Sequence, residues 1–184
     1  MHRSDTLRLF VALYPPPEVA ASLLAALTPL TLPDHRVTPA DHVHLTLMFI
    51  GDRRAKELRE VRESVERSAS GLGAFELTPQ RLITIPTPSQ GGPPRLVAAT
   101  TSSPPALLEI QRRLATRLAR PDERHKAYLP HITLCRYAHE ATSDPIDQPI
   151  TIAPFRVDRV QLMSSFITRA GAKHEVQAQI PLTG

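Results

Sequence analysis

His44-Leu45-Thr46-Leu47 and His131-Ile132-Thr133-Leu134 are two near-copies of one stretch, 87 positions apart in the sequence. The same offset aligns residues well outside this stretch. It places Arg8 on Arg95, Pro17 on Pro104, Leu23 on Ile110 and Leu27 on Leu114. An offset shared by a strand, a helix and a motif is hard to obtain by chance, so the sequence indicates a duplicated unit.

Each copy reads as a strand, a helix and a second strand. In the first copy, alternating apolar residues predict strands at 7–13 and 44–51. Between them, the run Pro15–Pro17 and the spacing of Val19, Leu23 and Leu27 predict a helix with proline near its first turn. We expect Asp52 to cap a further helix whose outer face carries paired charges. The remaining elements are expected as strands at 74–78, 81–85, 95–100, 131–137, 155–162 and 174–180, with a helix introduced by Pro104 and Pro105. We therefore predict an α+β fold for residues 1–184, with pseudo-repeats at about 7–85 and 95–182.

Composition narrows the class of protein. The 184 residues carry a net charge of +4 with a sequence pI of about 9.7, which favours an anionic partner. The single cysteine, Cys135, excludes an internal disulfide framework and suits a reducing compartment. No signal peptide is recognised, because charges interrupt the N-terminal stretch, and no apolar run approaches the roughly 20 residues of a membrane span. We expect a cytoplasmic protein.

The paired motifs suggest acid–base chemistry. Side chains alternate along a strand, so His44 and Thr46 share one face about 7 Å apart, and so do His131 and Thr133. Leu45, Leu47 and Phe49 are expected on the opposite face, where helices can pack. A pseudo-two-fold arrangement then brings two imidazoles and two hydroxyls to one cleft. Such a quartet suits a phosphodiester, because one imidazole can take a proton from water while an imidazolium protonates the leaving oxygen.

Other enzyme classes fit the sequence less well. A zinc site lacks carboxylates or cysteines at ligand spacing after either histidine, apart from Cys135. There is no Gly-x-Ser-x-Gly turn of a serine hydrolase, and Gly91-Gly92 lacks the lysine of a phosphate-binding loop. We therefore predict a reaction that needs no metal, provided that the two histidines move both protons.

At these residues the chain resembles the two-histidine (2H) phosphoesterase superfamily, and within it the RNA 2′,3′-cyclic phosphodiesterases, formerly called 2′-5′ RNA ligases. The resemblance covers nearly the whole chain. It rests on RLFVAL at 8–13, the block from His44 to Gly51, PPRLVAA at 93–99, the block from Pro130 to Arg136, and the closing Ile180-Pro181-Leu182. It implies a bilobal fold in which two antiparallel sheets form a central cleft and helices pack on the outside. It also implies hydrolysis of RNA 2′,3′-cyclic phosphates to 2′-phosphomonoesters without a cofactor.

The resemblance assigns roles to individual residues. His44 matches the proton donor and His131 the proton acceptor, an order that the two equivalent copies cannot supply themselves. Thr46 and Thr133 match the phosphate-binding threonines, and Arg136 matches the arginine that follows the second motif, a candidate contact for phosphate or substrate. Strict alternation would place Arg136 on the helix face, so a bulge or the strand end must bring it to the cleft. The chain departs from the pattern at Met48, where relatives often have arginine, and at His174, where the closing motif has tyrosine.

Several other side chains are secondary candidates. Phe10 shares a strand face with Arg8 and is a candidate for stacking on a nucleobase, or else a core residue. Arg8 and Arg95 either rim the cleft or are solvated. Cys135 is expected to be a small buried filler, although alternation puts it on the face of His131. A basic cluster either guides RNA phosphates or is a solvated helix end, and it comprises Arg117, Arg120, Arg124 and Lys126.

Three functions remain in competition. The first is the hydrolase, acting on RNA with 2′,3′-cyclic phosphate ends or on cyclic nucleotides. The second is the reverse reaction, a 2′-5′ ligase that joins RNA halves through the same transition state. The third is an RNA-end or nucleotide-binding module without turnover, against which the two titratable imidazoles argue. For each of these a monomer without membrane association is expected.

Overall fold

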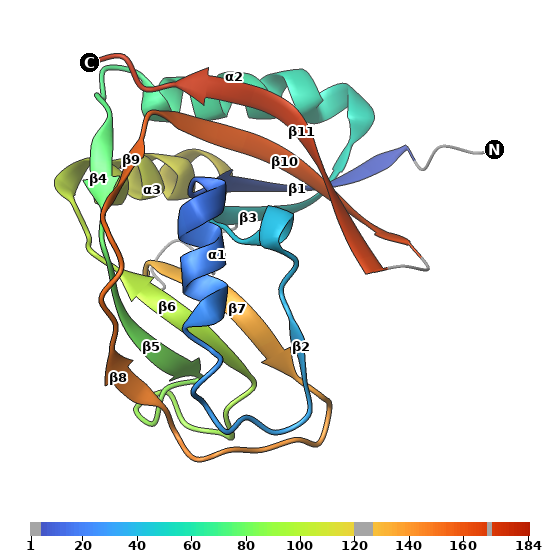
Figure 1. The fold of residues 1–184 in the computed structure, drawn as a ribbon. Coiled ribbons are helices and arrows are strands. Elements are labelled where there is room, and N and C mark those ends of the chain that lie inside the picture. The colour runs from blue at the N-terminus through green and yellow to red at the C-terminus, as the bar shows by residue number, and fades with distance from the viewer. Residues whose placement is uncertain (1–4, 120–126, 169–170) are drawn as a thin grey trace.

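The computed structural model describes residues 5–119, 127–168 and 171–184, which form an α+β fold of antiparallel sheet and helices (Figure 1). The helices are α1 (Pro17–Ala25), η1 (Ala40–His42), η2 (Ala55–Glu57), α2 (Leu58–Ala69) and α3 (Pro105–Leu118). The strands are β1 (Thr6–Leu13), β2 (His35–Val37), β3 (Leu45–Arg54), β4 (Phe75–Leu77), β5 (Pro79–Ile85), β6 (Leu96–Thr101), β7 (His131–Tyr137), β8 (Asp147–Pro149), β9 (Phe155–Val157), β10 (Arg159–Thr168) and β11 (Gly171–Pro181). The predicted α+β class and its antiparallel sheets are confirmed.

The main sheet consists of two groups of strands that meet at one residue pair. Its order is β11-β10-β1-β3-β7-β6-β5-β8, with β2 added on β7, while β4 and β9 form a separate ribbon. Strands β3 and β7 are joined by the antiparallel pair Leu45 and Ile132. These two residues are mates at the 87-residue offset, so the pseudo-two-fold axis of the duplication passes between them. The two expected sheets are thus the two halves of one continuous sheet. Each candidate catalytic histidine immediately precedes one of the two residues of this pair.

Both repeats contribute to a single hydrophobic core behind the sheet. The core-facing stripe of α1 contains Val19 and Leu23, and that of α3 contains Leu107, Ile110 and Leu114. Leu45 and Leu47 of β3 lie in the same core, as do Ile132 and Leu134 of β7. Helix α3 packs against α2 and against β3, a strand of the other repeat. The helices therefore hold the two repeats together from the side opposite the histidines.

A β-bulge interrupts each motif strand at the same position of the repeat. The extra residue is Leu47 in β3 and Leu134 in β7, which are mates at the common offset. The register shows this directly, because Val11 and Ala12 pair with Met48 and Thr46, while Val97 and Ala98 pair with Cys135 and Thr133. A bulge adds one residue to one strand and locally changes which face the following side chains take. The duplication has therefore preserved the irregularity together with the motif.

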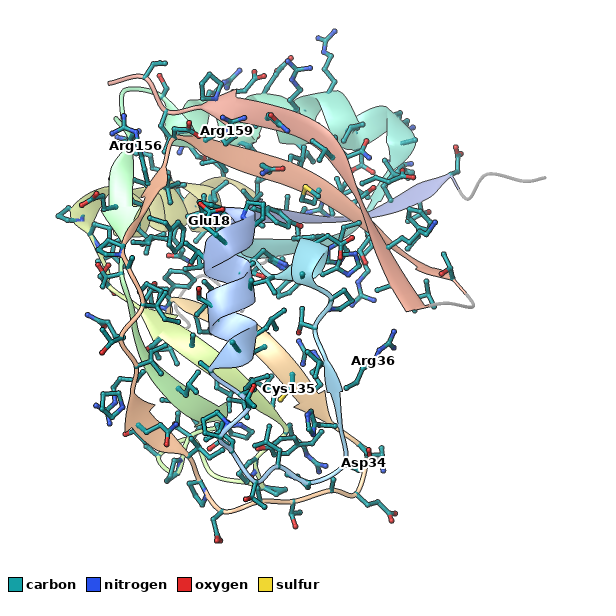
Figure 2. All side chains as sticks on the ribbon, in the orientation of Figure 1. Glu18, Asp34, Arg36, Cys135, Arg156 and Arg159 are labelled. Carbon is teal, nitrogen blue, oxygen red and sulfur yellow. The ribbon has the colours of Figure 1, made fainter. Side chains whose placement is uncertain are left out.

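The bulges correct three expectations drawn from strict alternation. Phe49 was expected on the helix face, but it lies on the cleft face and is 65% exposed. Cys135 does not share the face of His131, because it is buried in the main core, where it is a small filler (Figure 2). Arg136 reaches the cleft face through the bulge at Leu134. Two consecutive apolar residues, Leu-Met in β3 and Leu-Cys in β7, mark each bulge in the sequence.

The region after the first motif also differs from expectation. Asp52 does not cap a helix; it lies inside β3, opposite Arg8. The strand continues to Arg54, whose backbone N–H donates to the carboxylate of Glu57, the last residue of η2. Gly51 allows this continuation because it adopts a φ of 79° beside an irregularity of the β1–β3 register. Among the described residues, no helix is both long and apolar enough to cross a bilayer.

Candidate active site

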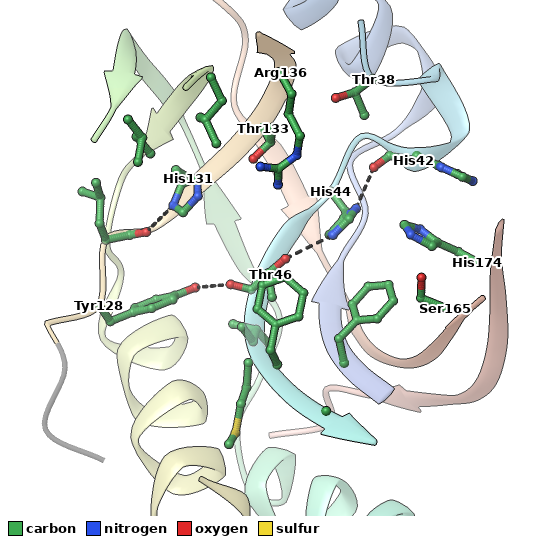
Figure 3. Close-up of a pocket in the computed structure, with 18 of the residues that line it drawn as sticks. Thr38, His42, His44, Thr46, Tyr128, His131, Thr133, Arg136, Ser165 and His174 are labelled. Carbon is green, nitrogen blue, oxygen red and sulfur yellow. Dashed lines mark hydrogen bonds between the residues drawn. The ribbon is translucent and has the colours of Figure 1, made fainter. Parts of the chain in front are cut away.

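A cleft of about 820 Å³ lies on the sheet face opposite the core. The two motifs, the arginine that follows the second one and the stacking candidate all line it, and they come from both repeats. They are Phe10, His44, Thr46, His131, Thr133 and Arg136. Figure 3 shows Thr133 and Arg136 lying between the rings of His131 and His44. The junction of β3 and β7 therefore concentrates the polar side chains of both motifs in one place.

The two histidines are oriented by the same backbone hydrogen bond. Nδ1 of His44 lies 2.6 Å from the carbonyl oxygen of His42, and Nδ1 of His131 lies 2.7 Å from that of Leu129. A carbonyl oxygen can only accept, so each Nδ1 carries the proton and donates it. In the neutral rings Nε2 is then the free basic nitrogen. This repeated contact to the residue two positions earlier directs both Nε2 atoms at the cleft.

His44 sits in an aromatic enclosure. Its ring centroid lies 5.3 Å from that of Phe10, 5.2 Å from that of Tyr14 and 5.5 Å from that of His174. Burial lowers the pKa of His44 to about 4, and the charges of His174, His42 and Arg136 act in the same direction. The bond to the His42 carbonyl opposes this shift. In the free protein His44 is therefore a neutral imidazole at neutral pH.

His131 has a less enclosed position. Burial is the main cause that lowers its pKa, and the charge of Arg136 adds to it, while the bond to the Leu129 carbonyl opposes the shift. Arg136 thus acts on both rings, as expected for a guanidinium between them. An anion bound beside Arg136 would reverse this effect on both histidines, because opposite charge stabilises imidazolium.

Thr46 is held from two sides. Its hydroxyl lies 3.1 Å from Nε2 of His44, and since that nitrogen is unprotonated, the hydroxyl donates to it. Its backbone carbonyl accepts a hydrogen bond of 3.0 Å from the Tyr128 hydroxyl, across the cleft from β3. Burial raises the pKa of Tyr128, so its phenol stays protonated and remains a donor. This bond joins the segment before β7 to β3 and fixes the spacing of the two motifs.

The aromatic side chains of the cleft differ in accessibility. Phe10 lines the cleft, but it is only 3% exposed and packs with Ala12 and Met163 in a small cluster. Its ring centroid lies 6.1 Å from that of Phe49, which is exposed. A planar base can therefore reach the ring of Phe49 more readily than that of Phe10. Strict alternation predicts Phe49 on the helix face, and the bulge at Leu47 turns its side chain to the cleft face.

Two histidines that the sequence did not nominate also belong to the site. His42 and His174 stack with ring centroids 4.1 Å apart and an interplanar angle of 15°. His174 also meets Phe10 edge-on at 4.9 Å, and its Nδ1 lies 3.4 Å from the Tyr14 hydroxyl. Burial lowers the pKa of His174, and the charge of His42 adds to this. No sequence periodicity links residues so far apart in the chain; the signal available was the position of His174 in the closing motif.

The secondary arginine candidates have different locations and partners in the structure. Arg8 lines the cleft, whereas its repeat mate Arg95 donates through Nη1 to the His139 carbonyl at 2.7 Å. Arg117 donates to the carbonyl of Arg113 within α3. The rest of that basic cluster, Arg120, Arg124 and Lys126, lies outside the described residues. Across the ranges that the structure describes, no three His, Cys, Asp or Glu side chains are grouped to hold a metal ion.

Comparisons with known proteins agree with the fold and the motifs. A family model described as the 2′-5′ RNA ligase superfamily matches residues 15–165. No curated protein sequence matches the chain. The chain is similar to the solved structure of TT0787 of Thermus thermophilus, with a TM-score of 0.80 and 26% identity over 96% of this chain and 98% of that one.

A second similar structure carries a nucleotide. E. coli LigT complexed with 3′-AMP has a TM-score of 0.78 and 25% identity, over 98% of this chain and 100% of that one. The same E. coli protein has been solved complexed with phosphate and with NADP+. A structure described as a phosphoesterase has a TM-score of 0.80 and 26% identity, over 97% of this chain and 99% of that one.

Proposed function

Because the chain belongs to the 2′-5′ RNA ligase superfamily, we propose that it hydrolyses 2′,3′-cyclic phosphates at RNA ends and leaves a 2′-phosphate. Membership of this superfamily supports the coarser conclusion that the protein is an enzyme acting on phosphoesters. The observation that carries the finer proposal is the repeated Nδ1–carbonyl bond, which directs Nε2 of both His44 and His131 at one cleft. Two opposed imidazoles can move both protons of a hydrolysis, so the reaction needs no metal or cofactor.

The proton transfers follow from the two positions. Nε2 of His131 accepts a proton from water as the water oxygen attacks phosphorus. The bond between phosphorus and O3′ breaks, and His44, protonated at Nε2, donates its proton to O3′. The products are a 2′-phosphomonoester and a free 3′-hydroxyl. His131 then carries the extra proton and His44 has lost one, and exchange with solvent restores both.

The phosphate is held by groups placed between the histidines. Arg136 is exposed on the cleft face and can pair with the non-bridging oxygens, where negative charge grows in the transition state. The hydroxyls of Thr46 and Thr133 share that face and can donate to the same oxygens. When His44 becomes protonated at Nε2, the Thr46 hydroxyl can no longer donate to it and turns to the phosphate.

Substrate binding allows His44 to take up from solvent the proton that it needs. The pKa of His44 is about 4 in the free protein, so the ring has no second proton to give near neutrality. A bound phosphate places a negative charge beside it and raises that pKa. The enzyme therefore takes up a proton when it binds its substrate, and His44 becomes an acid in the complex.

The test follows the product and the two histidines together. Purified protein is incubated, in excess EDTA, with an RNA oligomer that ends in a 2′,3′-cyclic phosphate, and the product is read by phosphorus NMR. We expect conversion to a 2′-phosphate in the wild type and in His139→Ala, an exposed histidine outside the cleft. His44→Ala and His131→Ala should each lose activity by roughly 10² or more.

The same samples separate the competing functions. Activity that EDTA removes, or that both histidine variants retain, would contradict the two-histidine mechanism. Binding of the cyclic end without conversion in the wild type would identify a binding module. Net joining of a second RNA with a 5′-hydroxyl, in place of hydrolysis, would show that ligation is the direction of the reaction.

A further inference from the structure

We infer that Arg8 and Ser165 bind a second phosphate, the one on the 5′ oxygen of the nucleotide that carries the cyclic phosphate. This inference rests on the proposed function and extends it to a preference for substrates whose cyclic-phosphate nucleotide also carries a phosphate on its 5′ oxygen. Both residues line the cleft with the two motifs, and they are direct neighbours in the pairing of β1 with β10. A guanidinium and a hydroxyl side by side are suitable donors for phosphate oxygens.

The position of Arg8 differs from that of Arg136. Arg136 lies between the rings of His44 and His131 (Figure 3), and its charge lowers the pKa of both, so it is the arginine suited to the central phosphate. Arg8 is four residues along β1 from Ala12, which pairs with Thr46. At about 3.3 Å per residue this separates the Cα of Arg8 from the motif by roughly 13 Å, and the long side chain can shorten that gap. Arg8 thus suits a group one nucleoside away from the reacting phosphorus.

The space between the two phosphate positions is lined by rings. Phe10 lies between Ala12 and Arg8 on β1 and pairs with Phe49 of β3, whose ring is 65% exposed. An exposed aromatic ring in a cleft is a stacking platform for any base. A nucleotide with its cyclic phosphate at the histidines would therefore place its base near Phe49 and its 5′ oxygen near Arg8.

Arg8 is available for this contact. Its guanidinium has no hydrogen-bond or ion-pair partner within residues 5–119, 127–168 and 171–184, whereas its repeat mate Arg95 is committed to the His139 carbonyl. Asp52 lies opposite Arg8 on β3, so its exposed carboxylate is a negative charge beside the subsite. The charge of Asp52 repels a 5′-phosphate bound at Arg8, so removing that carboxylate should strengthen the phosphate contact.

The experiment compares adenosine 2′,3′-cyclic phosphate with its 5′-phosphorylated form, two substrates that differ by one phosphate. In the wild type the 5′-phosphate should raise kcat/KM roughly tenfold or more, as a charge-assisted contact predicts. Arg8→Ala should abolish that advantage and leave the 5′-hydroxyl substrate within about twofold of wild type. Asp52→Asn should enlarge the advantage. Arg59→Ala, an exposed arginine on α2 paired with Glu63, is the matched control and should change nothing.

The salt dependence of this advantage is a second measurement, and it would not change in Arg8→Ala if Arg8 had only a structural role. The advantage of the 5′-phosphate should fall with ionic strength in the wild type and be insensitive to it in Arg8→Ala. A wild type that treats both substrates alike, or an Arg8→Ala variant that slows both equally, overturns the inference and leaves the hydrolase intact. Absence of turnover with either substrate in the wild type overturns the proposed function, and the inference with it.

Discussion

His44 and His131 make the same hydrogen bond but have different surroundings. The bond to the carbonyl two residues earlier comes from the duplicated sequence, because His42 and Leu129 occupy equivalent positions. The aromatic enclosure does not, because the rings of Phe10, Tyr14 and His174 surround His44 only. The sequence could predict the pair of histidines from their spacing. It could not predict that the two histidines have different surroundings, because these depend on contacts between distant strands.

The protonation of His44 is the most direct test at this scale. Its side-chain NMR signals should titrate with a midpoint near pH 4 in the free protein, because burial lowers the pKa of the imidazolium to about that value. Inorganic phosphate should move that midpoint upwards, since the anion stabilises the charged ring. A midpoint near 6.5, the ordinary value of histidine, that phosphate does not change would contradict the coupling of proton uptake to binding.

The hydroxyl of Thr46 should be needed and its methyl group should not. Thr46→Val keeps the shape of the side chain and removes the donor, so we expect kcat to fall by roughly 10²-fold, as for the loss of one transition-state donor. Thr46→Ser retains the hydroxyl and should recover most of the rate. Steady-state kinetics on a cyclic-phosphate substrate distinguish the two. Equal losses in both variants would show that Thr46 acts through packing.

At the scale of elements, most strands and helices follow from periodicity, and the bulges do not. The strand β7 begins where alternation predicts, and the helix α1 begins within the run Pro15–Pro17 that is expected near its first turn. Bulges at Leu47 and Leu134 leave only a doubled apolar residue in the sequence, which is also typical of an ordinary buried strand. This is why strict alternation predicts the wrong face for Phe49. The short strands β2 and β8, three residues each, are too brief for any pattern to reveal.

Gly51 provides a test of the strand geometry. Its φ of 79° is a conformation that side chains with a Cβ adopt only with strain, so Gly51→Ala should lower the free energy of unfolding by about 1–2 kcal/mol. Gly73→Ala is the control, because Gly73 has no positive φ and an added Cβ would make only ordinary contacts at 3.8 Å. Urea unfolding of both variants measures the difference. Equal stability would show that the strand does not depend on this conformation.

At the scale of the whole molecule, the duplication places one site at the junction of two repeats. The motif strands meet at the pair Leu45 and Ile132, so neither repeat contains a complete cleft. The sequence predicted this convergence through its fixed offset. It did not predict that His42 and His174 would stack beside the site, because that contact joins η1 to β11, far apart in the chain. The family's motif supplied the proposed catalytic roles, and the fold explains how they come together.

The shared core leads us to expect a single unfolding transition. Leu23 of α1 and Ile110 of α3 are mates at the common offset, and both are fully buried in the same cluster. Leu23→Ala and Ile110→Ala should each lower the free energy of unfolding by about 2–5 kcal/mol and shift one common transition. Circular dichroism and tyrosine fluorescence should therefore coincide in urea. Two separate transitions, each moved by one variant, would show that the repeats fold as independent domains.

The measurement that tests the central claim most directly is the pH dependence of cyclic-phosphate hydrolysis. If His44 and His131 are the acid–base pair, kcat/KM should follow a bell. Its maximum should lie below pH 6.5, because the pKa of each histidine is lowered from that value in the free protein. The maximum of kcat should lie at higher pH, because the bound phosphate raises both pKa values. A rate that rises continuously above neutrality would contradict the two-histidine mechanism.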